Sequence, residues 1–140
     1  MKKFYRYMSS EEFGLMISGV TLERKNNIWK GANTTSDGFC FLSQDTKCVD
    51  KRGTEYTLDP IECYDFLAGI VSKDILVEFE VDESLLTESI GTYSDPLGSW
   101  GDRISITEYC CKSYSCKKFS PISVCVGYDT YKPEWINIHA

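Results

Sequence analysis

Apolar and polar residues alternate along several stretches of the chain, and this pattern predicts β-strands. The clearest stretch is Ile75–Val81, where every second residue is apolar and two glutamates lie between them. Three other stretches are rich in aromatic or β-branched residues and are also predicted strands: Lys3–Met8, Gly38–Ser43 and Ser120–Tyr128.

The stretch Arg103–Cys111 alternates in the same way, but it carries a carboxylate on its apolar face. Ile104, Ile106 and Glu108 share one face, because successive side chains of a strand point to opposite sides. A carboxylate there is costly unless it is paired or opens into a cleft. Two interpretations stay open: a strand end at which Glu108 reaches water, or a carboxylate held at the mouth of a pocket.

Two segments in the N-terminal half show helical spacing of apolar residues behind a capping signal. The first begins after Ser9, with Glu12 placed three residues later to complete a capping box. The second begins after Asp59, has Pro60 at its first helical position and carries Glu62 as the capping-box partner.

Three further segments are polar or rich in glycine, and they predict loops: 21–37, 44–58 and 91–102. Both predicted helices lie in the N-terminal half, and the C-terminal half is rich in strands. This order predicts an α+β fold with a mostly antiparallel sheet. No repeat or low-complexity tract marks a boundary, so residues 1–140 are predicted to form a single domain.

Composition and charge narrow the classes of function. The chain has 140 residues, 42% of them hydrophobic, and a net charge of -6, which argues against binding to a phosphate backbone. No apolar run reaches the length of a membrane span, and the basic N-terminus is not followed by the apolar core of a signal peptide. We therefore expect a cytoplasmic protein that binds neither nucleic acid nor membrane.

Cysteine is abundant, with seven residues in the chain. The count is odd and no export signal is seen, so we expect reduced thiols. Cys110, Cys111 and Cys116 lie close in sequence, but neighbouring residues of a strand face opposite sides and no Cys-x-x-Cys pair occurs. This spacing does not fit zinc, and no metal site is predicted. A thiol-based redox or metal sensor using these three cysteines is kept as an alternative.

Several residues occur in an order that points to one family. Arg6 lies on the first predicted strand, Thr34, Thr35 and Ser36 precede the strand Gly38–Ser43, and Glu108 lies on a late strand. This order resembles the ADP-ribosyltransferase superfamily, in particular small toxin-like members from bacteria or phages. In that family a first-strand Arg or His, a Ser-Thr-Ser or Gly-aromatic strand, and a later Glu build the site.

The resemblance implies that NAD is the substrate and that its ADP-ribose is transferred to a protein acceptor or target, or released by hydrolysis. Cleaving the nicotinamide–ribose bond develops positive charge on the sugar, which a fixed carboxylate stabilises. Glu108 is the implied catalytic residue. The implied NAD-binding residues are Arg6, Thr34, Ser36, Phe39 and Phe41.

The chain departs from the family at two positions. The pocket tyrosine of the family would fall near Cys40 or Phe41, and neither has a phenol. Ile106 stands where the family often has Glu or Gln, two residues before the catalytic Glu, and that residue commonly helps to select a side-chain acceptor. These departures leave NAD hydrolysis, another acceptor or an inactive binding domain open.

A non-catalytic function is the alternative. A small acidic protein can occupy the basic surface of a partner, as a phage- or toxin-linked inhibitor would. Glu108 separates the two hypotheses, because such a binder has no need for a carboxylate on an apolar strand face.

Overall fold

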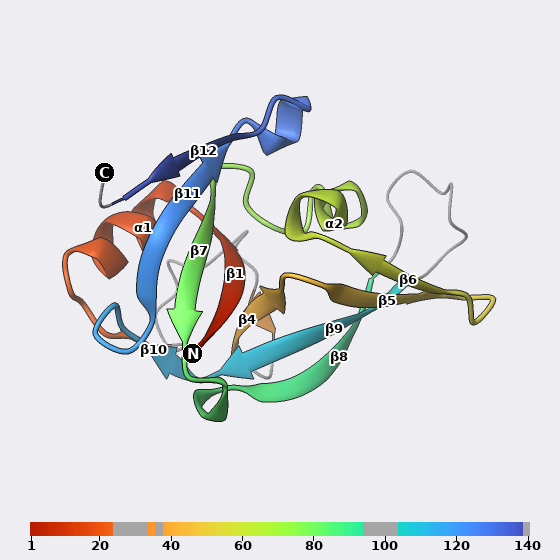
Figure 1. Cartoon of the computed structure of the whole chain (residues 1–140), viewed down its shortest axis with the longest axis horizontal. Coiled ribbons are helices and arrows are strands. Elements are labelled where there is room, and N and C mark those ends of the chain that lie inside the picture. The colour runs from red at the N-terminus through yellow and green to blue at the C-terminus, as the bar shows by residue number, and fades with distance from the viewer. Residues whose placement is uncertain (24–33, 36–37, 94–103, 139–140) are drawn as a thin grey trace.

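The computed structural model describes residues 1–23, 34–35, 38–93 and 104–138 (Figure 1). The elements in chain order are β1 (Lys2–Met8), α1 (Ser10–Ile17), β2 (Leu22–Glu23), β3 (Thr34–Thr35), β4 (Gly38–Ser43), β5 (Thr46–Asp50), β6 (Glu55–Leu58), α2 (Pro60–Leu67), β7 (Ile75–Val81), the 3-10 turn η2 (Glu83–Leu85), β8 (Thr87–Tyr93), β9 (Ile104–Cys111), β10 (Ser113–Tyr114), β11 (Ser120–Val126), the 3-10 turn η3 (Tyr128–Thr130) and β12 (Glu134–Asn137).

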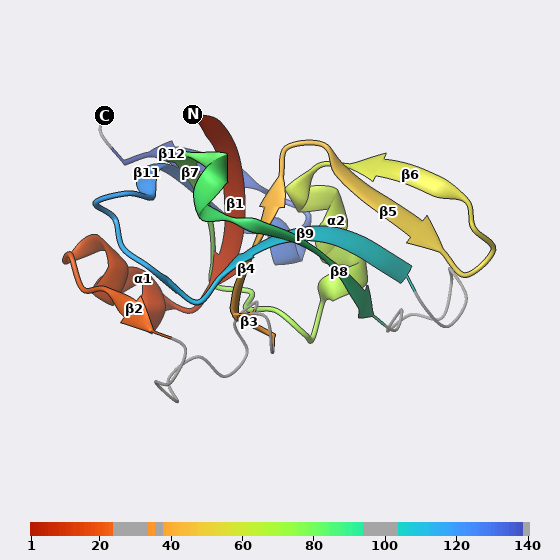
Figure 2. The same ribbon diagram turned by 90° about the horizontal axis from the view of Figure 1, so that it is seen from below.

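The main sheet has the strand order β12-β11-β7-β1-β4-β9-β5-β6, with β3 added to β4 and β8 added to β9. The paired strands run antiparallel, and a small second sheet joins β10 to β2. Figure 2 shows that the sheet curls, with the hairpin of β5 and β6 at one end. The predicted α+β fold with a mostly antiparallel sheet is therefore confirmed, and the part of the chain that the structure describes has two α-helices.

Apolar side chains form two cores, one on each face of the sheet. The first contains Phe41 and Phe79 together with Met16 of α1. The second contains Leu76 and Ile106 together with buried residues of α2, among them Leu67 and Phe66. Because each strand sends alternate residues to the two cores, the face of a residue decides which helix lies over it.

The capping signals are only partly confirmed. The Ser9 side chain accepts a hydrogen bond from the Glu12 backbone at 3.1 Å, as predicted. The prediction that the Glu12 side chain completes the capping box is wrong, because its carboxylate pairs with Arg6 instead. At α2 both halves of the predicted box, between Asp59 and Glu62, are present.

All three predicted loops contain strands. The predicted loop 21–37 includes the two-residue strands β2 and β3. Residues 44–58 form the hairpin of β5 and β6, turned at Gly53, whose φ is +84°. The strand β8 begins before the predicted loop 91–102 and extends into it. Its side chains are exposed or half-buried, so it lacks the apolar alternation that reveals a strand, and it is held by backbone pairing with β9. Within the described ranges no helix is both long and apolar enough to cross a bilayer.

Candidate functional site

The strands that carry most of the expected site residues are neighbours in the sheet. β4 lies between β1, which carries Arg6, and β9, which carries Glu108. The register pairs Tyr5 with Leu42 and Cys40 with Cys110. Of the strands that follow the family order along the chain, β1, β4 and β9 are neighbours in that order in the sheet, whereas β7 lies on the other side of β1.

The register also places Arg6 and Glu108 on opposite faces. Residues directly opposite each other in antiparallel strands share a face, so Tyr5, Leu42, Cys40 and Cys110 lie on one side. Glu108 is two residues from Cys110 and lies on that side, whereas Arg6 follows Tyr5 and lies on the other. The two residues therefore do not converge on one site.

Arg6 is completely buried in a bidentate ion pair with Glu12. Its Nε lies 2.7 Å from Glu12 Oε2 and its Nη2 lies 2.8 Å from Oε1, while Nη1 donates to the Cys40 carbonyl at 3.2 Å. Tyr114 also donates its hydroxyl hydrogen to Glu12. Burial lowers the pKa of Arg6, but the charge and hydrogen bonds of Glu12 outweigh it, so the pKa stands above its ordinary value.

Phe39 and Phe41 belong to the Arg6 cluster. Both rings are fully buried, and the Arg6 guanidinium carbon lies 5.0 Å and 5.8 Å from their centroids. Contact of Arg6 or of either ring with NAD requires this cluster to open, and such a role stays a prediction. Thr34 pairs with Phe39 through β3, but its side chain and all of Ser36 lie outside the described residues.

Glu108 is only 1% exposed, so the interpretation that it reaches water at a strand end is wrong. Tyr93, at the end of β8, donates its hydroxyl hydrogen to Glu108 Oε1. Burial raises the pKa of Tyr93, and the charge of Glu108 raises it further. A Cβ on Gly91 would lie 2.8 Å from both Glu108 Oε1 and the Tyr93 ring, so the missing side chain at Gly91 makes room for the pair.

Glu108 lies where β9 changes its partner. On one edge of β9, β4 pairs with Tyr109–Cys111, whereas β5 pairs with Ile104–Ile106. On the other edge β8 pairs with Ile104–Cys110, and Ser89 lies opposite Glu108. The carboxylate is therefore framed by three strands that come from separate parts of the chain.

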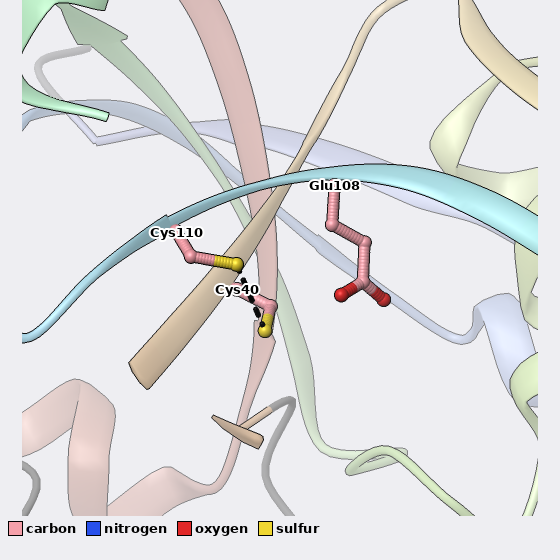
Figure 3. A group of neighbouring side chains, drawn as sticks. All are labelled: Cys40, Glu108 and Cys110. Carbon is pink, nitrogen blue, oxygen red and sulfur yellow. Dashed lines mark hydrogen bonds between the residues drawn. The ribbon is translucent and has the colours of Figure 1, made fainter. Parts of the chain in front are cut away.

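Two thiols complete the surroundings of Glu108. The Cys110 and Cys40 Sγ atoms lie 3.5 Å apart, and they lie with a Glu108 carboxylate oxygen within 4.8 Å of one another (Figure 3). Cys111 lies on the other face of β9, as the alternation predicted. No local pattern predicts the contact between Cys40 and Cys110, because the two residues are 70 positions apart and meet through the pairing of β4 with β9.

A cleft of about 710 Å³ opens beside this cluster, over β8 and the end of β9. Ser89 and Cys110 line it, and Lys112 supplies a cation. Glu108 is not among its lining residues, but it lies directly across the strands from Ser89. Sequence reasoning missed Ser89 and Tyr93 because it did not predict β8.

The cluster combines a buried carboxylate, a phenol that donates to it, and two thiols. A carboxylate held in an apolar setting can stabilise developing positive charge, and the thiols with the carboxylate are ligands that a soft or borderline metal ion prefers. Comparison of the chain with models of protein families, with curated proteins and with solved structures gave no match.

Proposed function

We propose that the protein cleaves NAD at the nicotinamide–ribose bond and transfers ADP-ribose to a protein acceptor or to water. The observation that supports this most is that Glu108 is buried and faces inward. Its strand β9 lies beside β4, and β4 in turn lies beside β1. The resemblance to ADP-ribosyltransferases implies a catalytic Glu on a late strand, and Glu108 is that residue; the Arg that the resemblance places in the same site lies on the other face.

Glu108 is the proposed catalytic residue. As the nicotinamide leaves, the ribose gains positive charge, and a carboxylate in a setting of low dielectric constant stabilises it more strongly than water does. Tyr93 holds the carboxylate in place and supplies a phenol at the site. This phenol comes from β8, whereas the family pattern would place its tyrosine near Cys40 or Phe41.

The cleft is the proposed binding site for NAD. A volume of about 710 Å³ falls within the usual size of ligand pockets. Lys112 offers a charge to the diphosphate, and Thr87 and Ser89 offer hydroxyls to a ribose. Because Ser89 separates the cleft from Glu108, productive binding requires a small opening between β8 and β9. The proposal makes no use of Arg6, which lies on the other face.

The test is release of nicotinamide from NAD by the wild-type chain and by the Glu108→Gln variant. Glu108→Gln keeps the shape of the side chain and removes the charge, so we expect release to fall at least 100-fold, on the order of an electrostatic catalytic contribution. Glu80→Gln, an exposed glutamate on β7, is the matched control and should retain the wild-type rate. Equal rates in wild type and Glu108→Gln, or no release at millimolar NAD, would contradict the proposal.

A second cleft favours the alternative of an acidic binding protein. Its volume is about 350 Å³, and Tyr5, Asp59, Glu78 and the partly exposed Trp135 are among its walls. Glu78 accepts hydrogen bonds from Tyr5 at 2.7 Å and from Ser123 at 3.2 Å. Two carboxylates beside aromatic rings, with no lysine or arginine among the described lining residues, suit an ammonium or guanidinium group of a partner.

This second function is tested with short peptides that contain lysine or arginine. Binding is followed through the chemical shift of the Trp135 indole N–H. We expect saturable shifts that weaken at high salt and that are lost in Glu78→Gln, while Glu80→Gln behaves as wild type. Identical shifts with a matched neutral peptide would count against a cation site.

A further inference from the structure

Cys40, Cys110 and Glu108 bring two thiol sulfurs and one carboxylate oxygen close together, and all three can be metal ligands. They come from β4 and β9, and each is nearly or completely buried, with 0%, 4% and 1% exposure. All three ligand atoms lie within 4.8 Å of one another (Figure 3). We propose that these three residues form a binding site for a zinc-class divalent metal ion.

The distance between the two sulfurs suits such an ion. A zinc–sulfur bond of about 2.3 Å with tetrahedral angles sets the two sulfurs of a site about 3.8 Å apart. The Cys40 and Cys110 Sγ atoms are 3.5 Å apart without a metal, so a shift of a few tenths of an ångström brings them to that spacing. Two thiolates and a carboxylate favour Zn²⁺ over Mg²⁺ or Ca²⁺, which prefer oxygen ligands alone.

The surroundings support the carboxylate as a ligand. Metal-binding carboxylates are commonly oriented by a hydrogen-bond donor, and Tyr93 donates to Glu108 Oε1. Gly91 leaves the space that the carboxylate and the Tyr93 ring occupy. Cys110 lines the cleft, which gives a small ion a route from solvent to the site.

Binding follows a defined proton balance. Both thiols lose their protons when they bind the ion, so two protons pass to solvent and the three ligands with the metal carry one negative charge. Three protein ligands leave the fourth tetrahedral position to water.

A metal ion bound to Glu108 would also prevent this carboxylate from stabilising the ribose of NAD. This consequence rests on the proposed function, whereas metal binding itself does not. Zinc would then inhibit nicotinamide release, and a chelator would restore it.

The test uses Co²⁺ as a spectroscopic probe of the full chain, kept reduced and without oxygen. We expect one equivalent of Co²⁺ to produce thiolate-to-cobalt charge-transfer bands and the intense visible bands of tetrahedral coordination, and Zn²⁺ to abolish both. The bands should disappear in Cys40→Ser and in Cys110→Ser and persist in the control Cys116→Ser, whose thiol lies outside the cluster. Tyr93→Phe should weaken binding by about 10- to 100-fold, the usual effect of removing a hydrogen bond to a ligand.

Two outcomes would overturn the site. The first is a reduced wild-type chain that gives no charge-transfer band. The second is a band that survives in the folded Cys40→Ser and Cys110→Ser variants, with circular dichroism as the check of folding. Because the readout is spectroscopic, it stays decisive even if the protein does not cleave NAD.

Discussion

Tyr93 and Glu108 meet across the pair of strands β8 and β9, with the phenol donating to a carboxylate that is almost completely buried. The contact ties a half-buried residue at the end of one strand to the centre of the next. Replacing Tyr93 with Phe keeps the ring and removes the donor. A hydrogen bond to a charged group contributes about 1.5–3 kcal/mol, so we expect Tyr93→Phe to lower the free energy of unfolding by that amount.

Urea denaturation measures this loss. Tyr131→Phe is the matched control, because Tyr131 is 79% exposed and its hydroxyl is open to water. An unchanged midpoint in Tyr93→Phe would show that the contact does not contribute to the stability of the native state.

Gly91→Ala should disturb the same pair. The added Cβ would stand 2.8 Å from Glu108 Oε1 and from the Tyr93 ring, closer than atoms normally approach. Overpacking of this kind costs about 1–3 kcal/mol. The control is Gly14→Ala within α1, where nothing lies within 4 Å and where alanine favours the helix by about 0.5–1 kcal/mol. Thermal melts should move in opposite directions for the two variants; a shift in the same direction would contradict the crowding at Gly91.

The Arg6–Glu12 pair should behave as a buried ion pair. Glu12→Gln leaves the guanidinium buried without its countercharge, and we expect a loss of about 3–5 kcal/mol. Replacing both residues together, as Arg6→Met with Glu12→Leu, should cost less than the two single changes combined. The exposed pair Lys47–Glu55, at 3.0 Å, is the control, and breaking it should cost about 0–1 kcal/mol. Additive losses in the buried pair would show that the two charges do not depend on each other.

The cysteines should differ in their reaction with a maleimide under native conditions. Cys116 and Cys111 are partly exposed, and the other five are buried. Burial raises the pKa of Cys111 to about 12, which keeps it in the unreactive thiol form at neutral pH. We therefore expect Cys116 to be labelled first, as read by peptide mass spectrometry. Labelling of Cys40 or Cys110 at the rate of Cys116 would mean that the cluster around Glu108 opens readily.

Stability should fall at alkaline pH. Burial raises the pKa of Tyr7, Tyr93, Tyr114 and Tyr128 in the fold above the ordinary tyrosine value of about 10. Above that pH the unfolded chain loses phenolic protons that the native chain keeps, so the free energy of unfolding decreases as the pH rises. The stabilisation is complete below pH ~10. Urea midpoints measured from pH 8 upward should stay level and then decline, and the decline should be smaller in Tyr93→Phe.

What the sequence could predict was local. The inward direction of Glu108 follows from alternation within a single strand, and the start of α2 follows from Asp59 and Glu62. The opposite placement of Arg6 and Glu108 depends on the register of three strands, which no local pattern contains. Tyr93 was missed because β8 is held by backbone pairing with β9 and has no apolar face to reveal it.

The partners of Arg6 and Cys110 show the same limit. Glu12 has the spacing of a capping residue, and only the burial of Arg6 explains why its carboxylate turns away from the cap. Cys110 lies near Cys111 and Cys116 in sequence, yet the thiol that it contacts at 3.5 Å belongs to Cys40 on β4.

The change of partner along β9 has a consequence for the order of folding. β9 can complete its pairing only after β4, β5 and β8 have formed. The contact between Cys40 and Cys110 also closes a loop of 70 residues. Contacts this distant in sequence form slowly, because the entropy of the loop is lost before the contact is gained. During synthesis the surroundings of Glu108 therefore stay incomplete until β9 has left the ribosome, because a nascent chain that ends before residue 108 contains Cys40 but neither Glu108 nor Cys110.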